Sequence, residues 1–152
     1  MLYRAHSFFP EHGDILDNPY LKMDRRPLNT SYKLHLIMGL WFQTRFGRNF
    51  RASALFCSGD LDQAYEYGNK IIAIQPIGDY ELCYSPKCRD LYDTMSAHKA
   101  RILPYEENID QIFELLDEQD FRHHKNSGLA EAAQSHNEVM LYAQSFRFEN
   151  IA

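Results

Sequence analysis

A single carboxylate lies at the start of an apolar, strand-like segment near the end of the chain. Segment 137–142 reads Asn-Glu-Val-Met-Leu-Tyr, a strand-like run in which Glu138 is the only acid. An acid in this place either takes part in chemistry or caps a turn. Segments 2–4 and 55–58 supply an arginine and a serine, the partners that such a carboxylate needs. The sequence therefore predicts an active site assembled from three distant strands, with the members Arg4, Ser58 and Glu138.

Short strands and helices must position these groups. Strands are predicted over 1–6, 50–57, 70–75, 80–84 and 138–142. The third and fourth of them are expected to form a hairpin through the turn Gly78-Asp79. Helices are predicted over about 30–46, 60–67, 86–91, 108–116 and 128–134. Segments 7–29 and 121–127 are predicted to be irregular, and the order of elements indicates a mixed α+β fold.

Composition bounds the class of protein. The 152 residues predict one domain, spanning 1–152, with a core of its own. No apolar run approaches the roughly 20 residues of a membrane span, and no signal-peptide pattern appears, so a cytoplasmic protein without membrane contact is expected. The net charge of -5 argues against a broad electrostatic grip on nucleic acid. Three irregularly spaced cysteines predict reduced thiols and no metal site: Cys57, Cys83 and Cys88.

The three segments together resemble the motifs of the ADP-ribosyltransferase superfamily, which includes bacterial toxins and poly(ADP-ribose) polymerases. Leu2-Tyr3-Arg4 is similar to the first motif, Leu-Tyr-Arg-Gly in toxin-type members. Segment 55–67 is similar to the second, a strand followed by a short helix with an alanine and a tyrosine. Segment 137–142 resembles Asn-Glu-Tyr-Ile-Val-Tyr, the third motif in polymerases. The resemblance implies an α+β, ADP-ribosyltransferase-like split β-sandwich with flanking helices.

The resemblance also implies a reaction on NAD as substrate. ADP-ribose would pass to a macromolecular acceptor, a protein or a nucleic acid, and nicotinamide would leave. The implied role is a toxin, a phage effector or a modifier of host machinery. Cleavage of the bond to nicotinamide resembles glycoside cleavage, in which a carboxylate stabilises an oxocarbenium-like transition state. Glu138 is the candidate for this task, with Ser58 to orient it and Arg4 to hold ribose or pyrophosphate.

The resemblance further implies a set of residues that contact NAD. Of Tyr65 and Tyr67, the second is preferred for stacking on nicotinamide, and the first is expected in the core. The run Arg25-Arg26-Pro27 is expected either as a solvated turn or as a grip on phosphate. The predicted NAD-binding residues are Arg4, His6, Phe56, Tyr67 and Arg26.

Three departures from the motifs leave alternatives open. Ala5 replaces the glycine of the first motif, and Gly59-Asp60 replaces Thr-Ser in the second. His136 stands where arginine-modifying members carry a second acid, which argues against arginine as the acceptor and makes His136 itself a candidate base. Two other functions compete with transfer: an NAD glycohydrolase, and a non-catalytic binding module. Each candidate also has a plain structural interpretation, as a surface ion-pair partner, a turn residue or a strand-edge acid.

Overall fold

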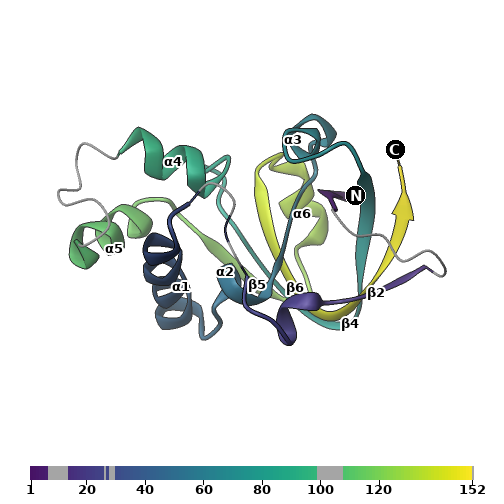
Figure 1. Cartoon of the computed structure of the whole chain (residues 1–152), viewed down its shortest axis with the longest axis horizontal. Helices are drawn as coiled ribbons and strands as arrows, with labels where there is room; N and C mark the ends of the chain where they lie inside the picture. Colours follow the sequence, from purple (N-terminus) through teal and green to yellow (C-terminus); the bar gives the residue numbers. More distant parts are fainter. Residues whose placement is uncertain (7–13, 26, 28–29, 99–107, 152) are drawn as a thin grey trace.

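The fold is described from a computed structural model, which covers residues 1–6, 14–25, 27, 30–98 and 108–151. The longer helices gather on one side of the molecule, and the strongly curved strands lie on the other side together with shorter helices (Figure 1). The strands are β1 (Leu2–Ala5), β2 (Ile15–Asp17), β3 (Leu55–Ser58), β4 (Ile71–Tyr84), β5 (Arg122–Lys125) and β6 (Glu138–Asn150). The helices are α1 (Tyr32–Phe46), α2 (Phe50–Ser53), α3 (Leu61–Tyr65), α4 (Leu91–Ala97), α5 (Ile109–Asp117) and α6 (Leu129–Gln134), with a 3-10 turn η1 (Pro19–Leu21).

All six strands belong to one antiparallel sheet, in the order β2-β6-β3-β1-β4-β5. An additional pairing between β4 and β6 closes four of them, β6, β3, β1 and β4, into a ring. The expected mixed α+β class is therefore confirmed. The strand order places β6, β3 and β1 side by side, although they lie far apart in the sequence, and this arrangement positions the candidate site.

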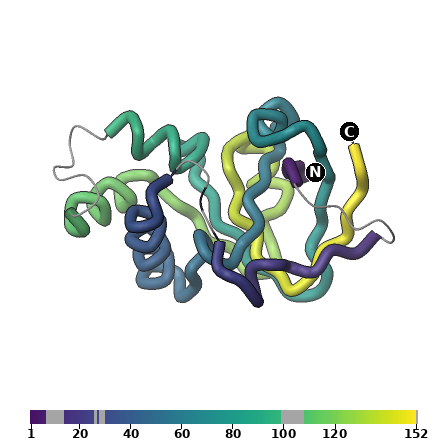
Figure 2. The backbone as a smooth tube through the Cα atoms, in the orientation of Figure 1, coloured from purple at the N-terminus to yellow at the C-terminus, as the bar shows by residue number. Residues whose placement is uncertain are grey.

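The long strand β4 replaces the predicted hairpin. Residues 71–84 run as one bent strand, and both of its halves pair with β6. The prediction of two strands was wrong. Gly78 does have the positive φ of a turn glycine, 72°, but it lies at a register shift in one strand, between Ile77 and Tyr80, and the chain does not reverse there. Figure 2 shows both long strands curving through the bottom of the view. Because of the bend, β4 and β6 remain paired on both sides of the register shift.

Four other sequence predictions were wrong in part. Segment 7–29, predicted to be irregular, contains strand β2, which pairs with β6, and the turn η1. Residues 50–53 form helix α2 instead of the start of a strand, because the Asn49 side chain caps it by accepting from the Ala52 amide at 3.0 Å. The predicted loop 121–127 contains strand β5, which pairs with β4 at the Leu82–His124 position. The predicted helix 86–91 is absent from the described residues, and α4 begins at Leu91 after the Asp90 cap.

Local signals placed several other elements correctly. Strand β1, helix α5 after its Asn108 cap, and helix α3 after its Asp60 cap all lie where they were predicted. Helix α1 ends at Gly47, which has φ 78°, as expected of a left-handed C-cap. Its N-cap is Ser31, one residue after the predicted start at about residue 30, and the Ser31 hydroxyl accepts from the Leu34 amide at 3.2 Å.

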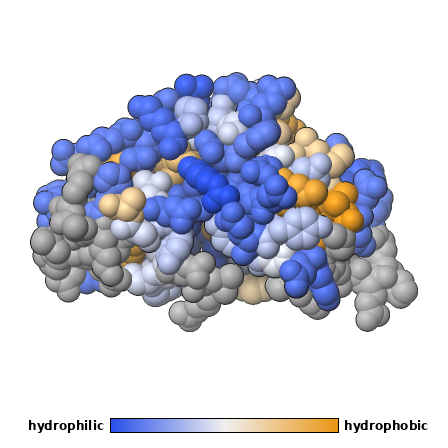
Figure 3. Space-filling model, turned by 90° about the horizontal axis from the view of Figure 1, so that it is seen from above, coloured by the Kyte–Doolittle hydropathy of each residue, from blue (hydrophilic) through white to orange (hydrophobic). Residues whose placement is uncertain are grey.

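Two apolar cores hold the fold together. The first lies between α1, α2, α4 and α5 and the sheet, around Met38, Phe42 and Phe50, which are fully buried. The second fills the strand ring and includes Leu55, Leu141 and two alanines of α6. The face seen in Figure 3 is mainly hydrophilic, with hydrophobic side chains gathered toward the ring side. Within the described part of the chain, no helix has the length and apolar character to cross a membrane.

Gly59 lies where β3 meets the inner helix α6, and it should not tolerate a side chain. A Cβ built on Gly59 would lie 1.9 Å from the carbonyl oxygen of Ala133, a backbone atom that cannot rotate away. Gly59→Ala should therefore cost about 3 kcal/mol of stability, as overpacking does. Thermal unfolding checks this. Gly68→Ala is the matched control, since its Cβ would lie 3.4 Å from the Ala5 Cβ, and an equal melting temperature for both variants would contradict the prediction.

Candidate functional site

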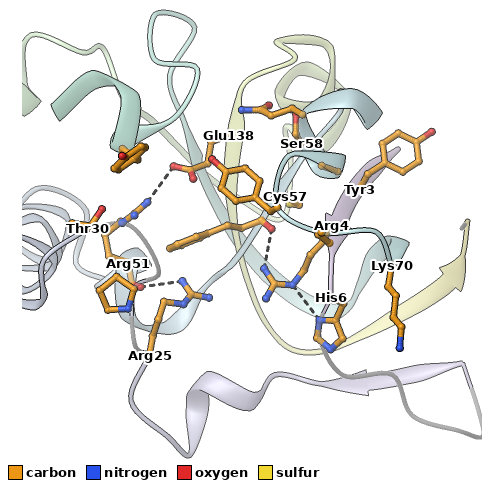
Figure 4. A pocket seen from close by; sticks show the side chains of 18 of the residues that line it. Tyr3, Arg4, His6, Arg25, Thr30, Arg51, Cys57, Ser58, Lys70 and Glu138 are labelled. Carbon is orange, nitrogen blue, oxygen red and sulfur yellow. Dashed lines mark hydrogen bonds and ion pairs between the residues drawn. The ribbon is translucent and has the colours of Figure 1, made fainter. Parts of the chain in front are cut away.

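A cavity of about 640 Å³ opens between the strand ring and helices α1 and α2. This size is within the usual range for ligand sites of roughly 300–1,000 Å³. Figure 4 shows Arg4, His6 and Lys70 on one side, Arg25, Arg51 and Thr30 on the other, with Glu138 and Ser58 above them. The predicted site residues that line it are Arg4, His6, Phe56, Ser58, Tyr67 and Glu138. The predicted phosphate-binding residue Arg26 lies outside the described residues.

Glu138 is the first residue of β6 and the acid of this cavity. Its amide donates to the Arg89 carbonyl at 2.7 Å, and its side chain is 14% exposed. One carboxylate oxygen receives a hydrogen bond from Arg51 Nη1 at 3.1 Å. Burial raises the pKa of the Glu138 carboxyl, the Arg51 guanidinium opposes that rise, and Asp90 adds to it. Burial and Asp90 therefore favour the protonated form of Glu138, and Arg51 favours its charged form.

Arg51 was not among the predicted site residues. It lies on α2, is 5% exposed, and reaches Glu138 only because residues 50–53 are helical. The predicted strand over 50–57 obscured this role. A usable signal was present, since Arg51 is the only charged residue in that otherwise uncharged segment. A lone charge among apolar residues is rarely buried unless it has a partner.

Arg4 is held by neutral acceptors from three segments. Its Nη1 donates to the Phe56 carbonyl at 3.0 Å, its Nε to His6 Nδ1 at 3.3 Å, and its Nη2 to the Tyr20 hydroxyl at 3.4 Å. Burial, together with the charge of Arg4, lowers the pKa of His6 to about 4. A neutral imidazole can accept from a guanidinium, so these contacts fix Arg4 and leave its charge uncompensated.

Two more arginines stack with aromatic rings beside Arg4. The Arg25 guanidinium lies 3.8 Å from the Tyr20 ring centre and 3.7 Å from that of Phe56. The Arg51 guanidinium lies 4.3 Å from the same Phe56 ring. Arg25 also donates to the carbonyls of Arg51, at 3.0 Å, and of Ala54. Phe56 therefore separates two buried cations. Of the Arg25-Arg26-Pro27 run, Arg25 and Pro27 line the cavity.

The cavity carries excess positive charge. Among the described residues, no carboxylate lies within ion-pair distance of Arg4 or Arg25, and Glu138 is the only acid in the lining. Burial lowers the pKa of Arg25 to about 10, which still leaves it charged at neutral pH. Buried cations without counter-ions are costly, so this cavity suits an anionic ligand.

Ser58 lies directly opposite Glu138 in the pairing of β3 with β6. Its hydroxyl accepts from the Asp60 amide at 3.0 Å, and within the described contacts it makes no hydrogen bond to Glu138. The serine thus stabilises the turn into α3, as its plain interpretation predicts, while its backbone position fixes the neighbouring acid.

The tyrosines and His136 divide between the cavity and the surface. Tyr67 lines the cavity, is 45% exposed and donates to Asp90 at 3.1 Å. Tyr65 lies outside the lining and is 40% exposed, so its expected place in the core was wrong. His136 is exposed in a left-handed turn with φ 58° and does not line the cavity. Its conjectured role as a base therefore has no support in this geometry.

The cysteines and other potential metal ligands do not form a cluster. Cys57, Cys83 and Cys88 are free and buried, and burial raises the pKa of Cys57 to about 12. Among the residues that the structure describes, no group of three or more histidine, cysteine or acidic side chains is arranged to hold a metal ion.

Comparisons with known proteins identify no relative of this chain. A scan of family models and searches of curated proteins and of solved structures give no match to this chain. Functional inference therefore rests on the residues and geometry described above.

Proposed function

We propose that this protein cleaves NAD between nicotinamide and ribose and transfers the ADP-ribose to a macromolecular acceptor. The carrying observation is one buried acid, Glu138, paired with Arg51 in a cavity whose lining also holds Arg4 and Arg25, neither of which lies within ion-pair distance of a described carboxylate. A carboxylate stabilises positive charge on a sugar, and guanidinium groups bind phosphate. NAD presents both features, a ribose bonded to a cationic ring and a pyrophosphate. The split β-sandwich, NAD as substrate and the toxin-like role belong to the same proposal.

Glu138 would act on the ribose of NAD. Its carboxylate accepts a hydrogen bond from a ribose hydroxyl and stabilises the oxocarbenium-like transition state as nicotinamide leaves. This requires the ionised acid, and burial works against ionisation. Arg51, 3.1 Å away, opposes that effect. Arg51 is therefore the group that favours the ionised form of Glu138, the form that this role needs.

Other lining groups fit the remainder of NAD. Arg4 and Arg25 provide the positive charge that a pyrophosphate needs. Gln63 Nε2 donates to the same Arg89 carbonyl, at 2.9 Å, that receives the Glu138 amide, so the glutamine lies beside the acid. Its Oε1 is buried without a partner, and a ribose hydroxyl would satisfy it.

Incubation of the purified protein with NAD labelled in the adenylate, together with a cell lysate, tests the proposal. We expect free nicotinamide and labelled macromolecules in equal amounts. Nicotinamide without labelled macromolecules would identify water as the acceptor and the protein as a glycohydrolase. Neither product, from protein shown to be folded by its thermal transition, would refute enzymatic activity and favour a binding module.

A further inference from the structure

Unpartnered polar atoms occur in several of the residues that line the cavity. Among the described residues, four buried side-chain atoms lack a hydrogen-bond partner, and three belong to residues that line this cavity. They are His35 Nδ1, Arg51 Nε and Gln63 Oε1. The three residues are 4%, 5% and 2% exposed. Burial of an unpaired polar atom is costly, so these atoms indicate a ligand that pairs with them.

Two of these atoms lie on the side of the cavity away from Arg4. Arg51 projects from α2 and His35 from α1, and Figure 4 shows Arg51 across the cavity from Arg4 and His6. Arg51 uses Nη1 for Glu138 and leaves Nε–H free to donate. Arg51 is also near enough to His35 that its charge contributes to lowering the pKa of the imidazole to about 4, after burial. His35 is therefore neutral and can accept a hydrogen bond.

The charge on this side restricts the acceptor. Arg25 and Arg51 are both buried here, and the one acid, Glu138, already pairs with Arg51. An arginine or lysine side chain would bring a third positive charge into this space without a free carboxylate to receive it. The acceptor must therefore be neutral or anionic, which agrees with the absence of a second acid at His136.

Aromatic rings at the mouth add a second restriction. Tyr67 and Tyr92 both line the cavity and are 45% and 44% exposed. Exposed rings at the entrance of a site offer stacking faces for nucleobases. A donor next to a neutral imidazole matches an adjacent C=O and N–H, the amide edge of guanine, thymine and uracil. Adenine and cytosine offer an acceptor nitrogen beside an exocyclic N–H, but that amine is a far weaker acid than the ring N–H of an amide base and does not readily give up its proton to an imidazole.

Resting on the proposed function, we propose that the acceptor is an amide-containing base of a single-stranded nucleic acid. The Arg51 Nε–H donates to the base carbonyl, and the His35 imidazole accepts the adjacent N–H. With a net charge of -5, the chain recognises the base more than the phosphate backbone, so binding should depend only weakly on salt.

The transfer step balances in atoms and charge. The base nitrogen forms a bond to the ribose C1′ while the bond from C1′ to nicotinamide breaks. Nicotinamide leaves as a neutral molecule with the bonding electron pair. The proton of the base N–H passes to the His35 imidazole and then to solvent, so one proton replaces the positive charge of the NAD ring.

Defined oligonucleotides test the proposal. Labelled NAD is offered with single-stranded dT, rU, dA and dC 20-mers, and with unfolded casein as a protein acceptor. We expect label on dT and rU and little on dA, dC or casein. His35→Phe should lower labelling of dT about 100-fold, a typical contribution of a general base, and should lower labelling far more than it lowers nicotinamide release to water. His136→Gln, an exposed histidine, should change neither rate.

Other outcomes separate this proposal from the proposed function. Nicotinamide release with label on casein alone, or on no macromolecule, would overturn the nucleobase acceptor and leave NAD cleavage standing. Equal loss of release and labelling in His35→Phe would overturn the role of His35, and His35→Gln repeats the test if the phenylalanine variant melts early. If wild type releases no nicotinamide, fluorescence anisotropy with labelled dT 20-mer decides: base recognition predicts at least tenfold weaker binding by His35→Phe, and no binding by wild type refutes it.

Discussion

Glu138→Gln should lower the rate of NAD cleavage about 10³-fold, the effect of removing one preorganised electrostatic group. Glutamine keeps the size of the side chain but cannot carry the negative charge that stabilises the oxocarbenium-like transition state. Binding of NAD should change little, because Arg4 and Arg25 remain in place. The measurement is the rate of nicotinamide release at saturating NAD, together with the dissociation constant of NAD by calorimetry.

Glu149→Gln is the matched control. Glu149 is an exposed acid near the other end of the same strand, β6, where it pairs with Ala73. This variant should have wild-type activity and a wild-type melting temperature. If Glu138→Gln retained more than about a tenth of the wild-type rate, an electrostatic group of this kind would be excluded as the source of the catalysis.

Arg51→Gln should lower activity at pH 7 about 100-fold and move its pH dependence. The active form is ionised Glu138, so activity rises with pH through the pKa of that acid. Burial raises the pKa, and Arg51 opposes the rise. Loss of Arg51 removes this opposition, the pKa rises further, and a smaller fraction of Glu138 is ionised at pH 7. The acid limb of kcat/KM against pH should shift to higher pH.

A shift of the acid limb separates this electrostatic role from a structural one. Removal of one partner of a buried pair also costs roughly 3–5 kcal/mol of stability, so rates are compared well below each melting temperature. Arg51→Lys keeps the positive charge, so the acid limb of its kcat/KM profile should lie close to the pH of the wild-type limb. Arg45→Gln is the surface control, because Arg45 is 43% exposed in its pair with Asp117. An acid limb unchanged in Arg51→Gln would refute the proposed control of Glu138.

Elements with strong local signals were predictable from the sequence. Helix α5 has an Asn108 cap and an apolar face of regular spacing, and α1 has Gly47 at its end. The strand beginning at Glu138 was recognisable from its apolar run. These signals act over a few residues, where capping bonds and the alternation of side chains decide the conformation.

Elements whose conformation depends on distant partners were mispredicted. His123 and His124 read as a polar loop, yet they form β5 because β4 offers free hydrogen-bonding groups there. Gly78 reads as a turn, but β6 pairs with both flanking segments and draws them into one bent strand. Turn propensity is weak compared with the many backbone hydrogen bonds of a long ladder.

The sequence by itself determined that Arg4, Ser58 and Glu138 belong to three separate strands, because β1, β3 and β6 each have a local strand pattern. The register between them was not encoded locally, and it places Tyr3 opposite Ser58 and Ser58 opposite Glu138. Only the tertiary structure decided which groups surround Glu138. Arg51 meets it because Asn49 starts a helical turn, and Arg25 and His35 join because η1 and α1 pack against that turn. These contacts depend on burial and on long-range packing, which no short stretch of sequence encodes.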